Sequence, residues 1–255
     1  MDITTLLNNI NLLYLRKQNI NELISWIQKK DIKIFSDNGL VIINLKELLK
    51  TKNVNMETIK KHLPIVVHGG VDGADVGAIQ DPAGSAIGSG NKPDGGGASD
   101  AIYKKFLDLE PIPQINKGDA VFNGSTGLGK KILHSYAYSL TENPSNENDR
   151  YTVINKLKKT YVNAIKVFGQ GKSKLDKKDQ HRLNLVPVSA AIFGGQFKDA
   201  SIGHLQPSYT FAAIVLAIDE CIKGHVDIPE LYIYYYGEDV KKIADKVRNE
   251  LMKID

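Results

Sequence analysis

The segment Lys92–Tyr103, KPDGGGASDAIY, places three consecutive glycines directly before an apolar run. Glycine adopts backbone conformations and permits close approaches that a β-carbon forbids. A glycine-rich turn that opens a helix presents free N–H groups and the positive end of the helix dipole, which suit a phosphate. Asp94 and Asp100 flank the glycines and are candidates for acid–base chemistry or for capping the helix. A solvated surface loop fits the same residues.

The composition around this segment is that of a globular protein. The chain has 255 residues, of which 42% are hydrophobic and 24% charged, and its formal net charge is +4. This length allows one large domain or two small ones, and so mild a charge does not by itself favour a nucleic-acid partner. Cys221 is the single cysteine, which excludes an intramolecular disulfide and a cysteine-based zinc site.

The sequence shows no run of about 18 apolar residues, so we expect no membrane span. Residues 1–5 lack the basic start and apolar core of a signal peptide. We therefore expect a cytoplasmic protein, or an effector that is exported by a route independent of a signal peptide.

Residues 1–62 form a predicted N-terminal extension that is mainly helical, followed by a domain over residues 63–255. Apolar spacing predicts helix over residues 3–30, short strands over 32–35 and 40–43, and helix again over 47–50 and 56–62. Nothing in this extension carries recognisable chemistry.

The remainder alternates between strands and helices. Strands are predicted at residues 64–67, 76–80, 120–124, 185–189 and 231–236, and helices at 130–140, 151–168, 209–222 and 240–252. This order predicts an α/β sheet with helices on both faces, in which ligands bind beyond the carboxyl ends of strands. The glycine-rich loops fall at such positions.

One interpretation of these loops is a P-loop. The segment Gly124–Lys130, GSTGLGK, fits G-x-x-x-x-G-K after a strand, and the pair Asp219-Glu220 imitates the acidic residues that would hold magnesium. Lys131, however, stands where the motif requires Ser or Thr as a magnesium ligand. The apolar run Tyr209–Ile222 is also longer than a usual strand.

The alternative interpretation joins three separated stretches that together resemble macro domains. Residues 94–103 are similar to the G-G-G-V-D-x-A-I segment of that family, and residues 118–134 to its strand and the following apolar-apolar-His segment. Residues 186–194, VPVSAAIFG, are similar to its P-x-I-S-x-G-I-F-G loop. The resemblance covers roughly residues 65–255 and implies a three-layer α/β/α fold with a mixed sheet. Macro domains bind ADP-ribose, and many hydrolyse it from proteins or from derivatives.

The resemblance also implies which residues form the site. The triple glycine would lie along the distal ribose and diphosphate, the loop after residue 188 would wrap the diphosphate with backbone N–H groups, and Phe193 would pack on the distal ribose. Clustered backbone donors and an apolar platform suit such a ligand. No metal or cofactor is implied. The implied ligand-binding residues are Asp81, Gly95, Gly96, Gly97, Ser189, Ala190, Ala191, Ile192, Phe193 and Gly194.

The sequence departs from the family pattern at several of these positions. The usual N-A-A-N before the triple glycine reads Asp81-Pro82-Ala83-Gly84 here, and the aspartate after the third glycine is replaced by Ser99. Ala191 replaces the glycine of the S-x-G loop, and either Asp72 or Asp75 would serve as the adenine-binding acid. In these features the chain resembles poly-ADP-ribose glycohydrolase-like and bacterial-effector macro domains, which rely on acidic residues.

Hydrolysis at C1″ of the distal ribose would pass through an oxocarbenium-like transition state, with a base for the water or an acid for the leaving group. Asp100 and Asp94 are the predicted catalytic carboxylates, with helix capping as the alternative for Asp100. His134 is expected to be structural. The sequence thus predicts an ADP-ribosyl hydrolase acting on ADP-ribose derivatives or ADP-ribosylated protein, and the alternative is a reader that binds ADP-ribose without cleaving it.

Overall fold

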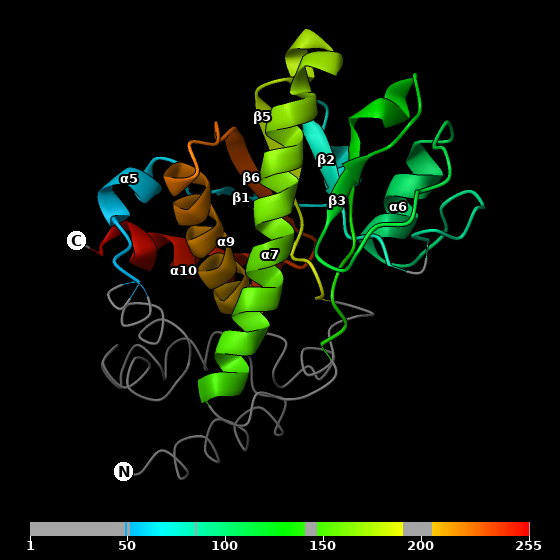
Figure 1. Ribbon diagram of the computed structural model, residues 1–255. Helices are drawn as coiled ribbons and strands as arrows, with labels where there is room; N and C mark the ends of the chain where they lie inside the picture. Colours follow the sequence, from blue (N-terminus) through cyan, green and yellow to red (C-terminus); the bar gives the residue numbers. More distant parts are fainter. Residues whose placement is uncertain (1–48, 50–51, 85, 141–146, 191–205, 255) are drawn as a thin grey trace, which may run out of the picture.

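The computed structural model describes residues 49, 52–84, 86–140, 147–190 and 206–254 (Figure 1). The helix predicted over residues 3–30 and the strands predicted over 32–35 and 40–43 lie outside these residues. Within them the chain forms a six-stranded sheet in the order β1-β6-β5-β2-β4-β3. The strands are β1 (Ile65–His68), β2 (Ala78–Asp81), β3 (Ala120–Phe122), β4 (Ile132–Ser135), β5 (Arg182–Leu185) and β6 (Glu230–Tyr235).

Strands β1, β6, β5, β2 and β4 run parallel, and only β3 pairs antiparallel, with β4. In the centre of the sheet Ile79 of β2 lies opposite Asn184 of β5 on one side and Ile132 of β4 on the other. The carboxyl ends of the five parallel strands therefore lie at one edge of the sheet. Ligands of open α/β sheets bind at such an edge.

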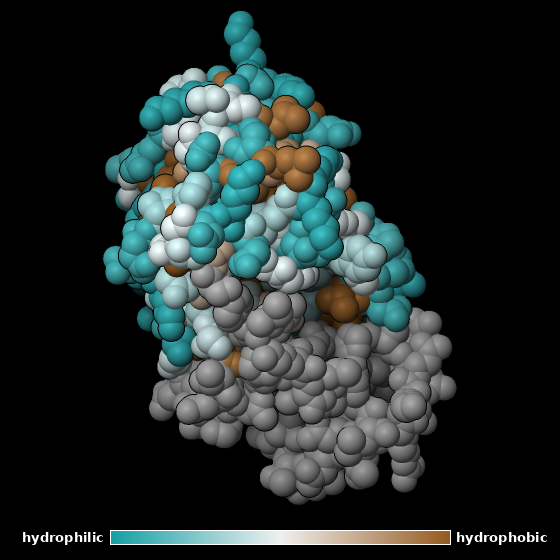
Figure 2. All heavy atoms as spheres, turned by 90° about the vertical axis from the view of Figure 1, so that its right-hand side faces the viewer, coloured by the Kyte–Doolittle hydropathy of each residue, from teal (hydrophilic) through white to brown (hydrophobic). Residues whose placement is uncertain are grey.

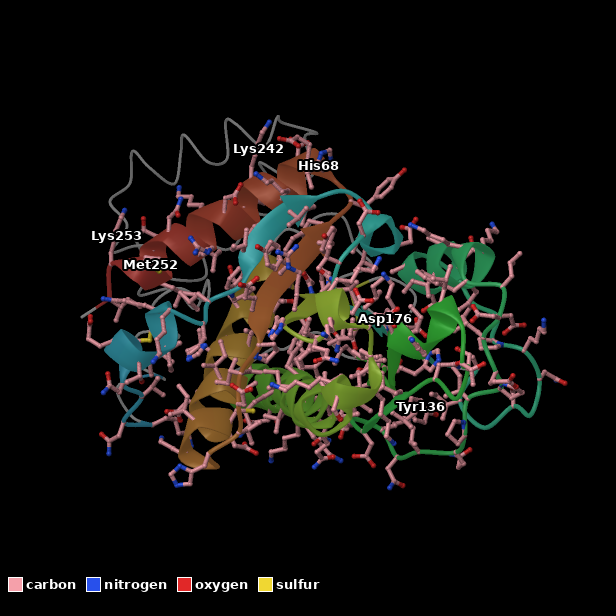
Figure 3. All side chains as sticks on the ribbon, turned by 90° about the horizontal axis from the view of Figure 1, so that it is seen from above. His68, Tyr136, Asp176, Lys242, Met252 and Lys253 are labelled. Atoms are coloured by element: carbon pink, nitrogen blue, oxygen red, sulfur yellow. The ribbon has the colours of Figure 1, made fainter. Side chains whose placement is uncertain are left out.

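Helices cover both faces of the sheet. In Figure 1, α7 (Glu147–Gly171) and α9 (Gln206–Lys223) lie side by side in front of it. Figure 3, seen from above, shows α10 (Glu238–Met252) and α6 (Ala98–Lys105) on the other side. The short helix α5 (Met56–Lys60) packs against α9. The predicted three-layer α/β/α fold class is therefore confirmed.

Helix α9 is the most deeply buried helix of the described fold. Every residue from Gln206 to Ile218 is buried, because α7, α10 and α5 pack around it. A helix that is apolar on all sides is stable only when it is enclosed in this way. None of the helices in the described part of the chain is both long and apolar enough to cross a membrane.

Most of the predicted elements after residue 63 appear within a few residues of their expected bounds, including β1, β2, β6, α7, α9 and α10. The helix predicted over residues 130–140 is wrong. A 3-10 turn, Leu128–Lys131, is followed at once by β4. The short apolar run Ile132-Leu133 is buried on both faces of the sheet, where helix and strand patterns look alike in sequence. The other 3-10 turns are Val71–Gly73, Lys172–Lys174 and Lys177–Asp179.

This correction removes the P-loop interpretation. A P-loop requires a helix immediately after its lysine, but here Lys130 precedes a strand and pairs with Asp176 at 2.7 Å. The acidic pair Asp219-Glu220 lies near the end of helix α9 rather than at the end of a strand. Asp219 pairs with Lys223 at 2.7 Å, so it is engaged on its own helix.

Candidate functional site

The triple glycine turns over the carboxyl end of β2 and leads directly into α6. Gly97, the residue before the helix, has φ +60° and ψ −129°, a conformation that only glycine adopts without strain. A β-carbon on Gly95 would lie 3.1 Å from Cβ of Ser99 and 3.4 Å from Cε2 of Tyr103. The backbone of Gly95 therefore rests directly on these two side chains of α6.

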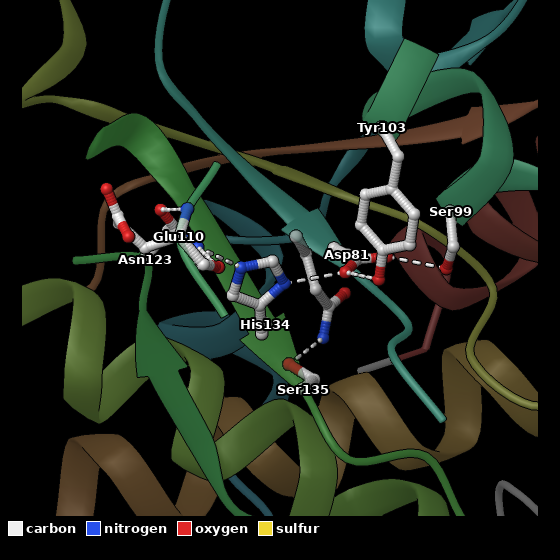
Figure 4. Close-up of polar contacts among 8 residues, drawn as sticks. Asp81, Ser99, Tyr103, Glu110, Asn123, His134 and Ser135 are labelled. Carbon is white, nitrogen blue, oxygen red and sulfur yellow. Dashed lines mark hydrogen bonds and ion pairs between the residues drawn. The ribbon is translucent and has the colours of Figure 1, made fainter. Parts of the chain in front are cut away.

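Asp81, the last residue of β2, lies beneath this loop with its carboxylate fully buried (Figure 4). Ser99 donates its hydroxyl proton to Oδ1 at 2.6 Å, and Tyr103 donates to Oδ2 at 2.6 Å. Residues four apart lie on the same face of a helix, so both hydroxyls reach one carboxylate. Burial and the charge of Asp81 raise the pKa of Tyr103, so the phenol keeps the proton that it donates.

His134 of β4 contacts Asp81 from the opposite side, with Nδ1 at 2.7 Å from Oδ2. Its other ring nitrogen, Nε2, lies 3.0 Å from Nδ2 of Asn123. The amide of Asn123 is oriented by its Oδ1, which accepts the backbone N–H groups of Glu110 and Ser125 at 3.0 Å each. We therefore assign the Nδ1–H tautomer to His134, with Nε2 as an acceptor. Because both nitrogens are engaged and the ring is fully buried, His134 is structural, as predicted.

The loop after β5 leaves the same edge of the sheet. Ser189 has φ +57°, in the left-handed region that non-glycine residues rarely occupy. Its hydroxyl donates to the carbonyl of Tyr138 at 2.6 Å. From α7, the hydroxyl of Tyr161 donates to the carbonyl of Val186 at 2.9 Å and accepts the N–H of Val188 at 3.1 Å. A strained backbone held by several side chains is frequent at functional sites.

The predicted catalytic carboxylates lie on the outer side of the glycine loop. Asp94 is exposed. Asp100 lies in the first turn of α6, has a side chain that is 42% exposed, and pairs with Lys104 at 2.8 Å. The N-cap position belongs to Gly97 and has no side-chain cap, so the capping alternative for Asp100 is wrong.

The predicted ligand-binding residues divide into four groups. Gly95, Gly96 and Gly97 form the loop over β2, and Ser189 and Ala190 end the described part of the β5 loop. Asp81 lies below the glycines, and its predicted ligand contact stays a prediction. The remaining four lie outside the described residues: Ala191, Ile192, Phe193 and Gly194.

The two candidate adenine-binding acids lie on the loop between β1 and β2. Asp72 is half-buried and Asp75 is exposed. The far end of this loop is anchored, since the N–H of Gly77 donates to Oδ1 of Asp179, in the turn before β5, at 2.7 Å, and Nδ2 of Asn184, in β5, donates to the carbonyl of Val76 at 2.8 Å. Both acids are thus carried by an anchored loop.

Three supporting residues were not predicted from the sequence: Tyr103, Asn123 and Tyr161. The four-residue spacing between Ser99 and Tyr103 was a usable signal, because it places both hydroxyls on one helix face. No such signal exists for Asn123 or Tyr161, whose partners come from distant elements.

Figure 2 shows the face of the molecule that lies on the right-hand side of Figure 1, and the described residues on this face are mostly hydrophilic, with a few apolar areas. A hollow of about 370 Å³ is lined by Lys92, Asp108–Pro111 and Ser125–Gly127, and neither the triple glycine nor Asp81 contributes to it. No group of three or more His, Cys, Asp or Glu among the described residues is arranged to hold a metal ion.

These features define a three-layer α/β/α protein with a glycine loop and a strained serine loop at one edge of its sheet. No protein-family model and no curated protein matches the sequence. Among solved structures, the chain is similar to an Oceanobacillus iheyensis macrodomain with ADP, at 15% identity over 74% of this chain and 90% of that chain, with a TM-score of 0.48. It is also similar to a Trypanosoma brucei macrodomain in complex with ADP-ribose, at 16% identity over 71% of this chain and 67% of that chain, with a TM-score of 0.45. These similarities are too distant to carry a function to this chain.

Proposed function

We propose that the protein binds ADP-ribose at the carboxyl edge of its sheet, between the glycine loop at residues 94–97 and the loop that begins at Ser189. The observation that carries the proposal is the pairing of these two loops on the neighbouring parallel strands β2 and β5. Gly97 and Ser189 each have a positive φ, and each loop is supported by a tyrosine hydroxyl from a neighbouring helix, Tyr103 of α6 or Tyr161 of α7.

The chemistry of the ligand fits this edge. A diphosphate is best bound by backbone N–H groups and a helix N-terminus, and α6 begins directly after the glycines. The motif resemblance over residues 94–103, 118–134 and 186–194 supports ADP-ribose within the wider class of diphosphates. We further propose that the bound group is cleaved at C1″ with help from Asp100 and Asp94. The alternative is a reader in which both aspartates only shape the loop.

Calorimetry with ADP-ribose and with ATP–Mg²⁺ tests the binding proposal. We expect ADP-ribose to bind without magnesium and ATP–Mg²⁺ to bind weakly or not at all. The control is Lys130→Ala, which removes a surface ion pair with Asp176 and should leave ADP-ribose binding unchanged. Absence of ADP-ribose binding, or ATP–Mg²⁺ binding that depends on Lys130, would contradict the proposal.

A further inference from the structure

We infer that Asp81 is a positioning residue, whose carboxylate sets the backbone of the Gly95–Gly97 loop through Ser99 and Tyr103. The inference deepens the proposed function, and its affinity measurement rests on that function. Its consequence for loop dynamics can be measured without any ligand.

Both oxygens of the Asp81 carboxylate are hydrogen-bonded. Asp81 is fully buried, and its two oxygens accept hydrogen bonds from Ser99 at 2.6 Å, Tyr103 at 2.6 Å and His134 at 2.7 Å. All three donors are neutral groups, and no Lys or Arg of the described chain is bonded to this carboxylate. Loss of the Ser99 hydroxyl would leave Oδ1 without a partner, and loss of the Tyr103 hydroxyl would leave Oδ2 with His134 alone; either loss is unfavourable for a buried carboxylate. The geometry of the donors is therefore tightly constrained.

Two of these donors, Ser99 and Tyr103, also contact the glycine loop. Gly95 rests on Ser99 and Tyr103, closely enough that an added β-carbon would crowd both side chains. Gly97 accepts the N–H of Ala101 at 3.2 Å, so the end of the loop is also the start of α6. Any movement of the two hydroxyl-bearing side chains therefore moves the support beneath the glycines.

The other side of the network is held in place by further hydrogen bonds. His134 is held by Asn123, and the amide of Asn123 is held by two backbone N–H groups. The network thus runs from the β3–β4 side of the sheet through Asp81 into α6 (Figure 4). Apolar side chains would fill the same space, but they would not select one orientation of the helix.

The sequence contains a matching signal. Asp81 and Ser99 are two of the positions at which this chain departs from the macro-domain pattern, which has Asn at the first and Asp at the second. In the structure these two departures contact each other at 2.6 Å. In this chain the pair therefore holds one carboxylate, on the strand, and one hydroxyl donor, on the helix.

The decisive experiment compares Tyr103→Phe with Ile102→Val by amide hydrogen exchange. Tyr103→Phe removes only the hydroxyl that reaches Asp81. Ile102→Val trims a fully buried neighbour on the same helix and leaves the network intact. We expect Tyr103→Phe to speed exchange at the amides of residues 95–98 by roughly five- to tenfold, the scale of one hydrogen bond. Ile102→Val should speed exchange at these amides no more than it speeds exchange at an amide in the buried helix α9.

The same pair of variants is then titrated with ADP-ribose. Tyr103→Phe should weaken binding by roughly five- to tenfold, and Ile102→Val should not change it when both proteins are fully folded. If both variants change loop exchange and affinity equally, the role of the network is only structural and the inference is overturned. If the unmutated protein does not bind ADP-ribose, the proposed function fails, while the exchange comparison still decides the inference.

A rescue experiment provides an independent check. Ser99→Asp alone would place two carboxylates together in a buried site and should strongly increase exchange at residues 95–98. Adding Asp81→Asn restores one carboxylate and one hydrogen-bond donor to the pair, so the double variant should return exchange to near the unmutated level. A double variant no better than Ser99→Asp alone would contradict the assigned role.

Discussion

Asn123 holds His134 in one tautomer. The Oδ1 atom of Asn123 accepts two backbone N–H groups, which turns its Nδ2 toward Nε2 of the imidazole at 3.0 Å. The proton of His134 must then lie on Nδ1, where it is donated to Asp81. The side-chain amide of Asn123, which follows β3, therefore ensures that His134 donates a proton to the carboxylate of Asp81 beneath the glycine loop.

Removal of this amide should destabilise the protein. Asn123→Ala leaves Nε2 of His134 and the N–H of Ser125 without partners in the interior, and it also removes the hydrogen bonds to the backbone of Glu110. We expect the free energy of unfolding, measured by urea denaturation, to fall by about 2–4 kcal/mol. The control Asn163→Ala removes a half-buried amide that donates to the carbonyl of Gly118, and it should lower the free energy by about 1 kcal/mol. Equal losses in the two variants would contradict the special role of Asn123.

Substitutions at Ser189 should separate backbone strain from hydrogen bonding. Ser189→Ala loses the bond to the carbonyl of Tyr138 and keeps a β-carbon at φ +57°. Ser189→Gly loses the same bond but relieves the left-handed strain. We expect the glycine variant to be more stable than the alanine variant by about 1 kcal/mol in thermal or urea unfolding. The reverse order would mean that the loop does not hold this conformation in solution.

The backbone conformation of Gly97 predicts that any side chain at this position destabilises the protein. Gly97→Ala places a β-carbon at φ +60° and ψ −129°, and we expect a loss of about 1–3 kcal/mol in stability together with weaker ADP-ribose binding. Gly124→Ala is the control, because its β-carbon would meet only Glu110 at an ordinary 3.9 Å. Calorimetry on both variants checks the expectation. Normal affinity in Gly97→Ala would separate the glycine loop from the ligand.

Asp100→Asn distinguishes an enzyme from a reader. If the protein is a hydrolase, this variant should bind ADP-ribose within a few-fold of the unmutated protein and turn over about 10²-fold more slowly. Asp94→Asn should have a smaller effect. The control is Asp245→Asn, since Asp245 pairs with Lys241 on α10 just as Asp100 pairs with Lys104 on α6. Release of ADP-ribose from a modified protein is the measurement.

The outcomes of this comparison are distinct. Unchanged turnover in Asp100→Asn, Asp94→Asn and the double variant would exclude the proposed catalytic carboxylates. No turnover by the unmutated protein on any ADP-ribosylated substrate would favour the reader.

Cys221 should report on unfolding. It is fully buried in α9, and burial raises the pKa of its thiol to about 11, so the reactive thiolate is scarce at neutral pH. We expect a thiol reagent to label the native protein very slowly and the urea-unfolded protein at once. Saturating ADP-ribose should slow native labelling further, because a ligand that binds only the folded state stabilises it. Rapid labelling in native buffer would show that α9 opens locally.

The sequence was most informative where an apolar pattern was long or where a motif held specific residues at fixed positions. The extended apolar run of α9 and the glycine segment before α6 could be recognised from their residues alone. The run Ile132-Leu133 could not, because two apolar residues fit a buried strand as well as a helix. Asp81 was recognised as a site position, but its three partners were not, because Ser99, Tyr103 and His134 meet it only once α6 and β4 are placed on the sheet.

The enclosure of α9 has a consequence for how this protein can vary. Most surface helices offer a solvent face on which substitutions are nearly neutral, but α9 is buried on its whole circumference from Gln206 to Ile218. A charged residue introduced anywhere in that stretch would face the interior, whichever side of the helix it occupied. Random mutagenesis should therefore leave an uninterrupted block of intolerant positions there, in contrast to the periodic tolerance along α10, whose buried residues are spaced along one face.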